Sequence, residues 1–331
     1  MDKKMMKAFV VDNPGGVDAL KLKEIPIPTS KPGWVVIKIK AFGLNRTEMF
    51  ARIGKAPNTK FPIVPGIECV GVVEDPSDSG LANGQKVAAI HPGHMGFYYN
   101  GTYAEYVLTP VTSVFPVDTS LDWATFGALP EMFQTVWGSL TAGLEVKSKQ
   151  SILIRGGTSS IGMTAARLAK SLGLTVLSTT RNPEKSDILK ENGVDHVIID
   201  DGELEDKVHE HYPEGVDRIL EIIGPETLLD SLKCAKKGGI VCMVGMLGAK
   251  WTIENFSPFG TIPHCVKLTA YYGAARDMVP EKFQEYVSDI EAGRQKVNIS
   301  KVFPLPEVPD AHQLIEENKA GGKLVVLVDE E

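Results

Sequence analysis

The chain has 331 residues, and its 35 Lys and Arg residues against 42 Asp and Glu residues give a formal charge of −7. This length accommodates two domains of roughly 150 residues, each with its own core. The acidic balance argues against nucleic acid and anionic membrane as partners, because both reward clustered positive charge. The content of 43% hydrophobic and 23% charged residues excludes global disorder.

The apolar runs of the sequence are short. The run at residues 324–328 is far below the roughly 20 apolar residues of a bilayer span. The apolar patch at residues 8–11, after a basic start, is shorter than the roughly 7–15 residues of a signal sequence core. We therefore expect a cytoplasmic protein.

The four cysteines, Cys69, Cys234, Cys242 and Cys265, lie far apart and include no C-x-x-C pair. This spacing indicates neither a structural zinc site nor a disulfide framework, and we expect scattered buried thiols. A close histidine pair, residues 91 and 94, stands in a Pro-Gly loop with no cysteine nearby. We expect this pair at the surface rather than at a metal.

The first third of the chain is rich in short apolar or alternating runs that Gly and Pro punctuate. Such a pattern predicts strands and, together, a small barrel or sandwich. The predicted strands cover residues 7–11, 35–41, 70–74, 86–90 and 103–108.

From about residue 122 the pattern alternates between strands and helices. Alternation of this kind predicts βαβ units and a doubly wound parallel sheet. The predicted strands are 151–155, 174–180, 196–199, 218–223 and 240–244, and the helices are 161–172, 184–192, 204–211 and 226–232. The tail predicts helices at 281–292 and 311–318 and a strand at 323–328, and we expect it to return to the first domain.

The strongest local motif is Gly-Gly-Thr-Ser-Ser-Ile-Gly at residues 156–162, between a predicted strand and a predicted helix. A small-residue turn at a helix N-terminus can bind a pyrophosphate through backbone N–H groups and the helix dipole. Gly157 and Gly162 fit the pattern G-x-G-x-x-G, but Ser159 stands where the middle glycine is expected. The candidate binding residues are Gly157, Thr158, Ser159, Ser160, Ile161 and Gly162. The alternative is a tight turn without a ligand.

The end of the next strand indicates which nucleotide binds. An NAD-specific site has an acidic residue there that accepts the ribose hydroxyls, whereas this strand ends in Thr180 and Arg181 and is followed by Lys185. A hydroxyl, a guanidinium and an ammonium suit a 2′-phosphate, so we expect NADPH. The alternative is that Arg181 and Lys185 are solvated residues at a helix start.

Several segments together resemble the medium-chain dehydrogenase/reductase superfamily and, within it, the zinc-independent quinone oxidoreductases. The resemblance spans nearly the whole chain in order, through residues 13–22, 43–48, 65–68, 101–106, the loop 156–162 and residues 322–326. It implies an α/β protein with a GroES-like catalytic domain and a Rossmann domain that bind NADPH between them. We expect these at residues 1–122 with 278–331 and at 123–277. The family also implies a homodimer, through edge strands of the Rossmann sheet.

The metal positions of the zinc-dependent relatives have other residues here. Those relatives hold the metal with a cysteine, a histidine and a second cysteine or acid, and the matching positions are Asn45, Ile67 and Glu131. Zinc favours thiolate and imidazole, and the Ile67 side chain has no donor atom. The cysteines of the family's structural zinc lobe are also missing, so we predict no metal.

Two carboxylates are candidates for proton transfer. By the resemblance, Glu68 and Glu131 line the place of the missing metal, where like charges would raise one pKa and provide a proton donor. The alternative is that each accepts hydrogen bonds from the backbone or from Arg46 and Arg52.

The resemblance assigns further roles at the site. Asn45 would orient the substrate or the nicotinamide ribose, and Thr135 would face the nicotinamide. Phe50 stands where relatives often have tyrosine, so it would stack on an acceptor without donating a hydrogen bond. Gly245 would flank the nicotinamide ring, and Lys323 would lie near the cofactor. The alternatives are a helical threonine bonded to a backbone carbonyl for Thr135 and a surface position for Lys323.

These features predict hydride transfer from NADPH to a quinone or an α,β-unsaturated carbonyl compound. Without a Lewis acid, such an acceptor needs mainly to be positioned against the nicotinamide. The alternatives are an enoyl-thioester reductase of the same superfamily and an NADPH-binding protein without catalytic activity.

Overall fold

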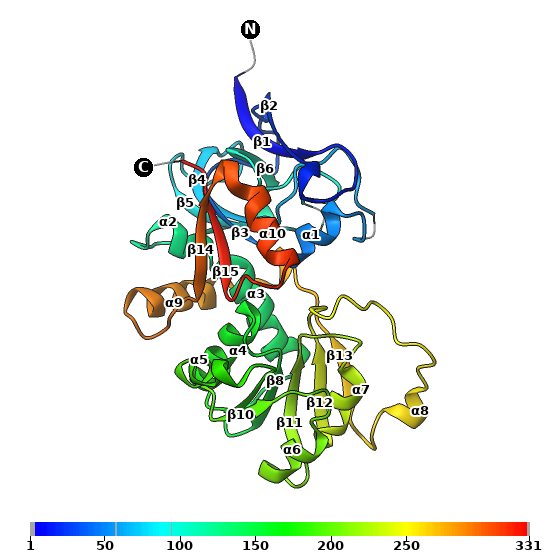
Figure 1. Ribbon diagram of the computed structural model, residues 1–331. Helices are drawn as coiled ribbons and strands as arrows, with labels where there is room; N and C mark the ends of the chain where they lie inside the picture. Colours follow the sequence, from blue (N-terminus) through cyan, green and yellow to red (C-terminus); the bar gives the residue numbers. More distant parts are fainter. Residues whose placement is uncertain (1–3, 57, 94, 330–331) are drawn as a thin grey trace. The chain divides into compact units, whose positions relative to one another are not determined.

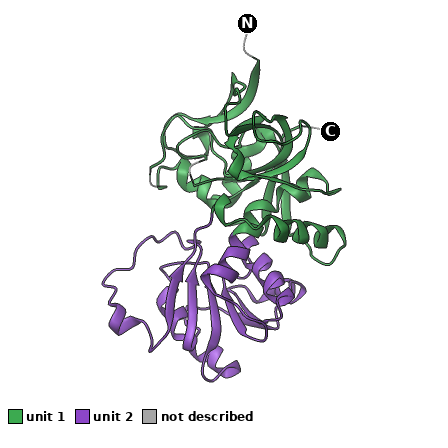
Figure 2. Cartoon of the chain, turned by 180° about the vertical axis from the view of Figure 1, so that it is seen from behind, with its two compact units in different colours: residues 1–134, 274–331 green, residues 135–273 purple. Residues whose placement is uncertain are grey.

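The structure is a computed structural model that describes residues 4–56, 58–93 and 95–329 (Figure 1). The chain forms two compact units, one from residues 1–134 and 274–331 and the other from 135–273 (Figure 2). The first boundary lies within helix α3 (Pro130–Gly138), not near residue 122. The reason is that helix α2 (Trp123–Gly127) packs on strands β3 and β15, both of which belong to unit 1.

Unit 1 is built on a seven-stranded sheet with the order β14-β15-β3-β4-β5-β7, in which β6 also pairs with β3. The last strand of the chain, β15, runs antiparallel to β3 and brings the C-terminal segment into this sheet. A separate hairpin consists of β1 (Met5–Val11) and β2 (Leu20–Pro26). The sheet strands are β3 (Trp34–Leu44), β4 (Glu68–Asp75), β5 (Lys86–Ile90), β6 (Tyr106–Pro110), β7 (Val114–Pro116), β14 (Ile299–Pro304) and β15 (Lys323–Leu327).

Helices α1 (Arg46–Arg52), α9 (Pro280–Glu291) and α10 (Val308–Glu316) complete unit 1. Its core contains a stacked pair of rings, Phe42 and Tyr103, with centroids 4.8 Å apart. The Tyr103 hydroxyl lies 3.0 Å from Nε2 of the buried His312. Burial lowers the pKa of His312 to about 3, so this histidine is neutral in the folded core.

Unit 2 is a six-stranded parallel sheet with the order β10-β9-β8-β11-β12-β13. Its central strand β8 (Ser151–Arg155) is buried along its whole length, as in sheets covered on both faces. The other strands are β9 (Thr175–Thr180), β10 (His196–Ile199), β11 (Val216–Glu221), β12 (Ala235–Met243) and β13 (Lys267–Ala270). The helices are α4 (Ser160–Ser171), α5 (Ser186–Glu191), α6 (Glu205–His211), α7 (Leu228–Lys233) and α8 (Pro258–Thr261).

Short helical turns join these elements. A π-helical turn at Ser139–Gly143 directly follows α3. The 3₁₀ turns are Val17–Ala19, Val111–Ser113, Pro183–Lys185, Ala275–Asp277 and Leu305–Glu307.

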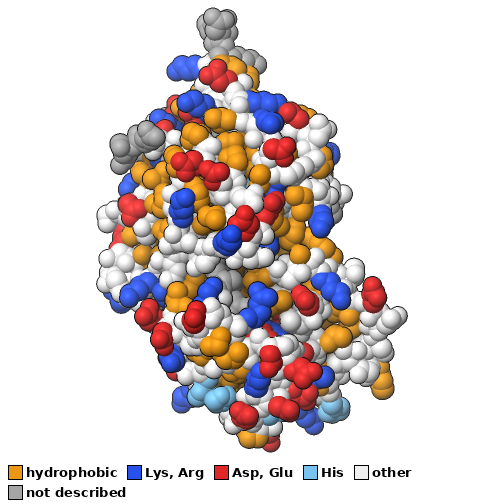
Figure 3. All heavy atoms as spheres, in the orientation of Figure 1, with side chains coloured by type: hydrophobic (Ala, Val, Ile, Leu, Met, Phe, Trp, Pro, Cys, Tyr) orange, Lys and Arg blue, Asp and Glu red, His pale blue; other side chains and the backbone are white. Residues whose placement is uncertain are grey.

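Three of the four cysteines are buried as predicted, but the prediction is wrong for Cys265, which is exposed. This residue lies in a turn before β13 and has a positive φ of 60°. Acidic and basic side chains alternate over the face shown in Figure 3, in line with the modest net charge. Within the described ranges, no helix combines the length and the apolar character that crossing a membrane requires.

Candidate functional site

The glycine-rich turn of unit 2 connects β8 to α4 and gives Ser159 a structural role. Ser159 is the N-cap of α4: its Oγ accepts a hydrogen bond from the Gly162 N–H at 3.0 Å and donates one to the Gly156 carbonyl at 2.7 Å. A serine is among the best N-cap residues. The departure from the glycine pattern at this position therefore stabilises the turn.

Close backbone approach explains both glycines of the motif. A Cβ atom on Gly157 would lie 1.9 Å from Oγ of Ser178, and one on Gly162 would lie 2.5 Å from the Gly156 carbonyl oxygen. The Gly157 N–H also donates to the Thr179 carbonyl at 3.1 Å, which ties the turn to β9. Larger residues at these positions would push the turn away from the sheet.

This turn can bind an anion. The first N–H groups of a helix, here those of Ser160 and Ile161, have no partner within the helix, and the dipole of the 12-residue α4 adds positive potential. Thr158, Ser159 and Ser160 are half-buried beside these groups. The structure therefore brings the predicted loop residues together in a geometry that suits a phosphate.

Two cations follow β9. Thr180 is buried and exchanges hydrogen bonds with the backbone of Asn182, whereas Arg181 and Lys185 are exposed. Neither cation forms a hydrogen bond or ion pair with any residue in the described part of the chain. Both are therefore available to an anionic ligand.

A buried charge network holds the strands on either side of the turn. The Arg155 side chain, 0% exposed, forms two hydrogen bonds of 2.9 Å with Asp200 and one of 2.7 Å with Asp230. Glu221, at the end of β11, accepts backbone N–H bonds from Ile223 and Gly224. Sequence reasoning missed this network, because the two acidic partners of Arg155 lie 45 or more residues away from it.

Gly245 follows β12 at a point where two chain segments touch. A Cβ atom on Gly245 would lie 2.5 Å from the Ile222 carbonyl oxygen, and one on Gly224 would lie 2.9 Å from the Gly245 carbonyl oxygen. These contacts allow no side chain at residue 245. The chain segments that follow β11 and β12 therefore pack directly against each other.

The main polar cluster of unit 1 centres on Lys323, the first residue of β15. Its Nζ donates to Oε1 of Glu68 at 2.6 Å and to Oδ1 of Asn45 at 2.7 Å. Lys323 is 3% exposed, so the alternative prediction of a surface position for this lysine is wrong. A glycine makes room for this pair: a Cβ atom on Gly43 would lie 2.4 Å from both Oε1 of Glu68 and Cε of Lys323.

The second oxygen of Glu68 accepts the backbone N–H of Glu131 at 2.8 Å. A backbone hydrogen bond to Glu68 was one of the alternatives predicted from the sequence. The other alternative, a hydrogen bond from Arg46 or Arg52, is wrong. Arg46 bonds to Asn318, and the buried Arg52 pairs with Glu316 and donates to the Gly15 carbonyl. Helix α1 directs both guanidinium groups toward other parts of unit 1.

Glu48 is a member of this cluster that sequence reasoning missed. Its carboxylate accepts the Asn45 backbone N–H at 2.7 Å and Nδ2 of Asn45 at 3.2 Å, while the same Nδ2 donates to Glu68 at 2.9 Å. Burial raises the pKa of Glu48 to about 8, although the nearby Lys323 opposes this shift. The sequence signal for this contact was Asn45-x-x-Glu48 at a helix start. As in a capping box, a carboxylate three residues after the N-cap can accept the N-cap backbone N–H.

The remaining predicted residues, all of unit 1 except Thr135 at the start of unit 2, lie in different surroundings. Glu131 is half-buried, with Oε2 4.0 Å from Nε2 of His91, and Thr135 follows it one turn later on α3. Phe50, 6% exposed, belongs to the apolar core, so its ring offers little surface to a ligand. The buried Ile67 presents only apolar atoms.

Two histidine observations bear on metal binding. Residue 94 of the predicted histidine pair lies outside the described residues. The structure instead pairs the rings of His196 and His211, with centroids 4.6 Å apart, which their separation in the sequence did not indicate. Across residues 4–56, 58–93 and 95–329, no three His, Cys, Asp or Glu side chains form a group that could hold a metal ion.

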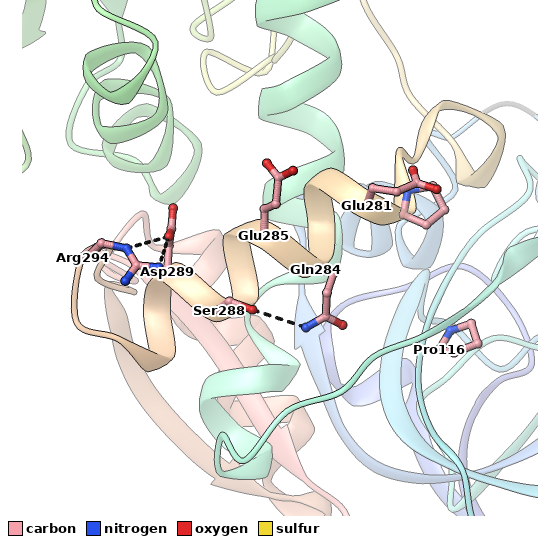
Figure 4. A pocket seen from close by; sticks show the side chains of 8 residues that line it. Pro116, Glu281, Gln284, Glu285, Ser288, Asp289 and Arg294 are labelled. Carbon is pink, nitrogen blue, oxygen red and sulfur yellow. Dashed lines mark hydrogen bonds and ion pairs between the residues drawn. The ribbon is translucent and has the colours of Figure 1, made fainter.

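A surface pocket lies beside α9, away from the predicted residues (Figure 4). Among its charged side chains, Asp289 pairs with Arg294 at 2.6 Å, whereas Glu285 pairs with Lys282 outside the lining. It is lined by Pro116, Pro280, Glu281, Gln284, Glu285, Ser288, Asp289 and Arg294. No predicted site residue belongs to this set.

Comparison with known proteins identifies relatives over the whole chain. Residues 31–119 match the alcohol dehydrogenase GroES-like domain, and residues 160–292 match the zinc-binding dehydrogenase family. Quinone oxidoreductase of Homo sapiens is 30% identical over 339 residues, a match that covers 98% of each chain.

Solved structures share this fold. The crystal structure of AibC has a TM-score of 0.87 and 25% identity, and the match covers 99% of this chain and 97% of AibC. The quinone oxidoreductase of Pseudomonas syringae has a TM-score of 0.86 and 23% identity, with 98% and 100% covered. The predicted α/β fold, a GroES-like part and a Rossmann-like parallel sheet, is confirmed.

The buried Glu48 gives unit 1 a testable dependence on pH. Because its pKa is higher in the folded than in the unfolded chain, the folded state binds more protons between about pH 5 and 8, and stability falls as the pH rises through this window. Glu48→Gln should remove up to about 1.4 kcal/mol per pH unit of that fall in the free energy of unfolding. Urea unfolding across the pH range measures this slope. The exposed Glu285→Gln should keep the parental slope, and equal slopes for both variants would contradict the assignment.

Proposed function

Because this chain belongs to the medium-chain dehydrogenase/reductase superfamily and is quinone oxidoreductase-like, we propose that it is an NADPH-dependent reductase of quinones or α,β-unsaturated carbonyl compounds. The observation that carries this proposal is the anion-binding turn of unit 2, followed by the two uncommitted cations Arg181 and Lys185. The name of the human relative supports the choice of a quinone as acceptor.

The residues of unit 2 fit the cofactor. The N–H groups of Ser160 and Ile161 would bind the pyrophosphate, and Gly157 and Gly162 keep side chains away from it. Arg181 and Lys185 would bind the 2′-phosphate, with the planar guanidinium able to grip it bidentately. When bound, NADPH supplies the hydride that reduces the acceptor.

We propose further site residues within each unit. Thr180, Thr158 and Ser159 would surround the phosphate-binding part, and Gly245, where the packing allows no side chain, would flank the nicotinamide end. In unit 1, Asn45 and Lys323 would contact the acceptor, with Glu68 behind them. Glu131 and Phe50 are proposed for the site in unit 1, and Thr135 for the site in unit 2.

We propose that the reaction proceeds without zinc. Of the three positions that match the zinc ligands of relatives, Ile67 has no donor atom, and the amide oxygen of Asn45 already accepts a hydrogen bond from the Lys323 ammonium. A divalent cation at this place would lie against a buried positive charge. These side chains therefore suit the Lys323 ammonium better than a metal ion.

We also propose a homodimer that forms through the edge of the unit 2 sheet. β13 is the last strand in the sheet order, and its segment carries the exposed aromatic residues Phe259 and Tyr272, which are 102% and 82% exposed. An open edge strand with apolar side chains nearby is suited to pairing with another copy.

The function is tested by following NADPH oxidation with 1,4-benzoquinone and with a small enone, in the presence of EDTA. We expect turnover with NADPH that survives the chelator, and slower turnover with NADH. Tight NADPH binding with no reduction of either acceptor would contradict the reductase proposal. Loss of activity in EDTA with recovery on adding zinc would contradict the metal-free mechanism.

The choice of cofactor is tested by Arg181→Ala. Loss of the guanidinium should weaken NADPH binding by about tenfold or more, because a charge-assisted phosphate contact contributes roughly 1.5–3 kcal/mol, and should leave NADH binding nearly unchanged. Fluorescence titration of both cofactors measures the effect. Lys147→Ala, an exposed lysine elsewhere in unit 2, is the matched control, and equal weakening of the two cofactors would argue against the phosphate contact.

The dimer is tested by light scattering of the intact chain and of Ala270→Pro, which removes a backbone N–H from the open side of β13, since the neighbouring Tyr271 N–H donates to Met243 of β12. We expect the mass of a dimer for the parent and of a monomer for the variant. A parent that is monomeric at all concentrations would rule out this interface.

A further inference from the structure

Lys323 has more N–H donors than its neighbours in the described residues accept. An ammonium carries three N–H groups, and two of them reach Oε1 of Glu68 and Oδ1 of Asn45. No other described residue accepts the third. Because the side chain is only 3% exposed, bulk water does not readily satisfy this donor, and an unpaired buried donor is costly.

The surrounding residues hold this ammonium in place. Glu68 is fixed by the backbone N–H of Glu131, and Asn45 is fixed by two hydrogen bonds to Glu48. Gly43 provides the space, since any Cβ there would collide with Lys323 and Glu68. The cation is therefore preorganised, as an electrostatic catalyst must be.

The cluster reaches the surface of unit 1 at its edge. Asn45 and Glu131 are half-buried, while Lys323 and Glu68 lie behind them. A small ligand that reaches Lys323 would find its third N–H without a partner among the described residues. The most suitable partner is an oxygen that carries, or develops, negative charge.

We propose that Lys323 is the electrophile and proton donor of the reduction, an inference that rests on the proposed function. Its N–H binds the carbonyl oxygen of the acceptor. When the carbon β to that carbonyl gains the hydride, the double bond shifts, the C=O π electrons move to oxygen, and the enolate oxygen takes a proton from Nζ. The nicotinamide is oxidised by two electrons and the acceptor is reduced by two. Water returns a proton to the neutral amine.

The test compares Lys323→Gln with the parent protein. Glutamine keeps an N–H donor for Asn45 and Glu68 but has neither a charge nor a proton to give. We expect kcat for the enone and quinone to fall by about 100-fold or more, in the range of general acid catalysis, while the Kd of NADPH changes less than twofold.

The matched control is Lys301→Gln, an exposed lysine on the neighbouring strand β14. It should keep the parental kcat. A kcat for Lys323→Gln within threefold of the parent would overturn the proposal. A fall in kcat accompanied by an equal loss of NADPH affinity would also overturn it, because that pattern indicates a structural role.

A binding measurement separates this inference from the proposed function. 4-Nitrophenolate, an aromatic oxyanion, reports on the site by its absorbance without turnover. Lys323→Gln should weaken its binding to the NADP⁺-saturated protein at least tenfold, whether or not any quinone is reduced. Equal binding to both proteins would reject Lys323 as an oxyanion partner, whereas an inactive parent that binds the phenolate through Lys323 would reject only the reductase function.

Discussion

The buried ion pair between Lys323 and Glu68 organises unit 1. It connects the first residue of β15 to the first residue of β4 across β3, the strand between them, at the position where Gly43 has no side chain. Ionic groups lose hydration when they are buried, and the loss is recovered only with good geometry and additional hydrogen bonds. Asn45 and the backbone of Glu131 supply those bonds. A change in any of these partners would leave a charge without compensation in the protein interior.

In both units, glycines make room for close contacts between chain segments. In unit 2, Gly157 and Gly162 let the turn pack closely against β9 and against its own first residues, and Ser159 fixes that turn. In unit 1, Gly43 lets a charged side chain occupy space that would otherwise hold a Cβ atom. Both sites thus depend on missing side chains at a few positions where backbone segments approach each other.

Local sequence patterns predicted the fold better than the contacts of the site. The strand before the glycine turn, the helix after it and the alternation beyond residue 150 are periodic signals, and the structure has all of them. Strands β13 and β14 were missed because they are short or largely exposed and lack an apolar period. Helix α3 was missed as well, although it carries Glu131 and Thr135.

The contacts within the polar cluster of unit 1 could not be predicted from local sequence patterns either. The resemblance singled out Asn45, Glu68 and Lys323, but not that they bond to one another, because the separation in sequence between Glu68 and Lys323 is 255 residues. Sequence also suggested Arg46 and Arg52 as partners of the carboxylates, which are near in sequence but directed elsewhere in the fold. Long-range partners depend on strand order, and no local period encodes that order.

The strand order also has a consequence for synthesis on the ribosome. Unit 2 is one continuous segment, residues 135–273, so all of its sheet has been made while the last part of the chain is still missing. Unit 1 has β3 near its beginning and β15 near its end, and Leu44 pairs with Leu324. Until the C-terminal residues emerge, β3 has one open edge, and such edges favour pairing with other chains. In the nascent first unit, Glu68 therefore lacks its counter-ion until β15 has been synthesised.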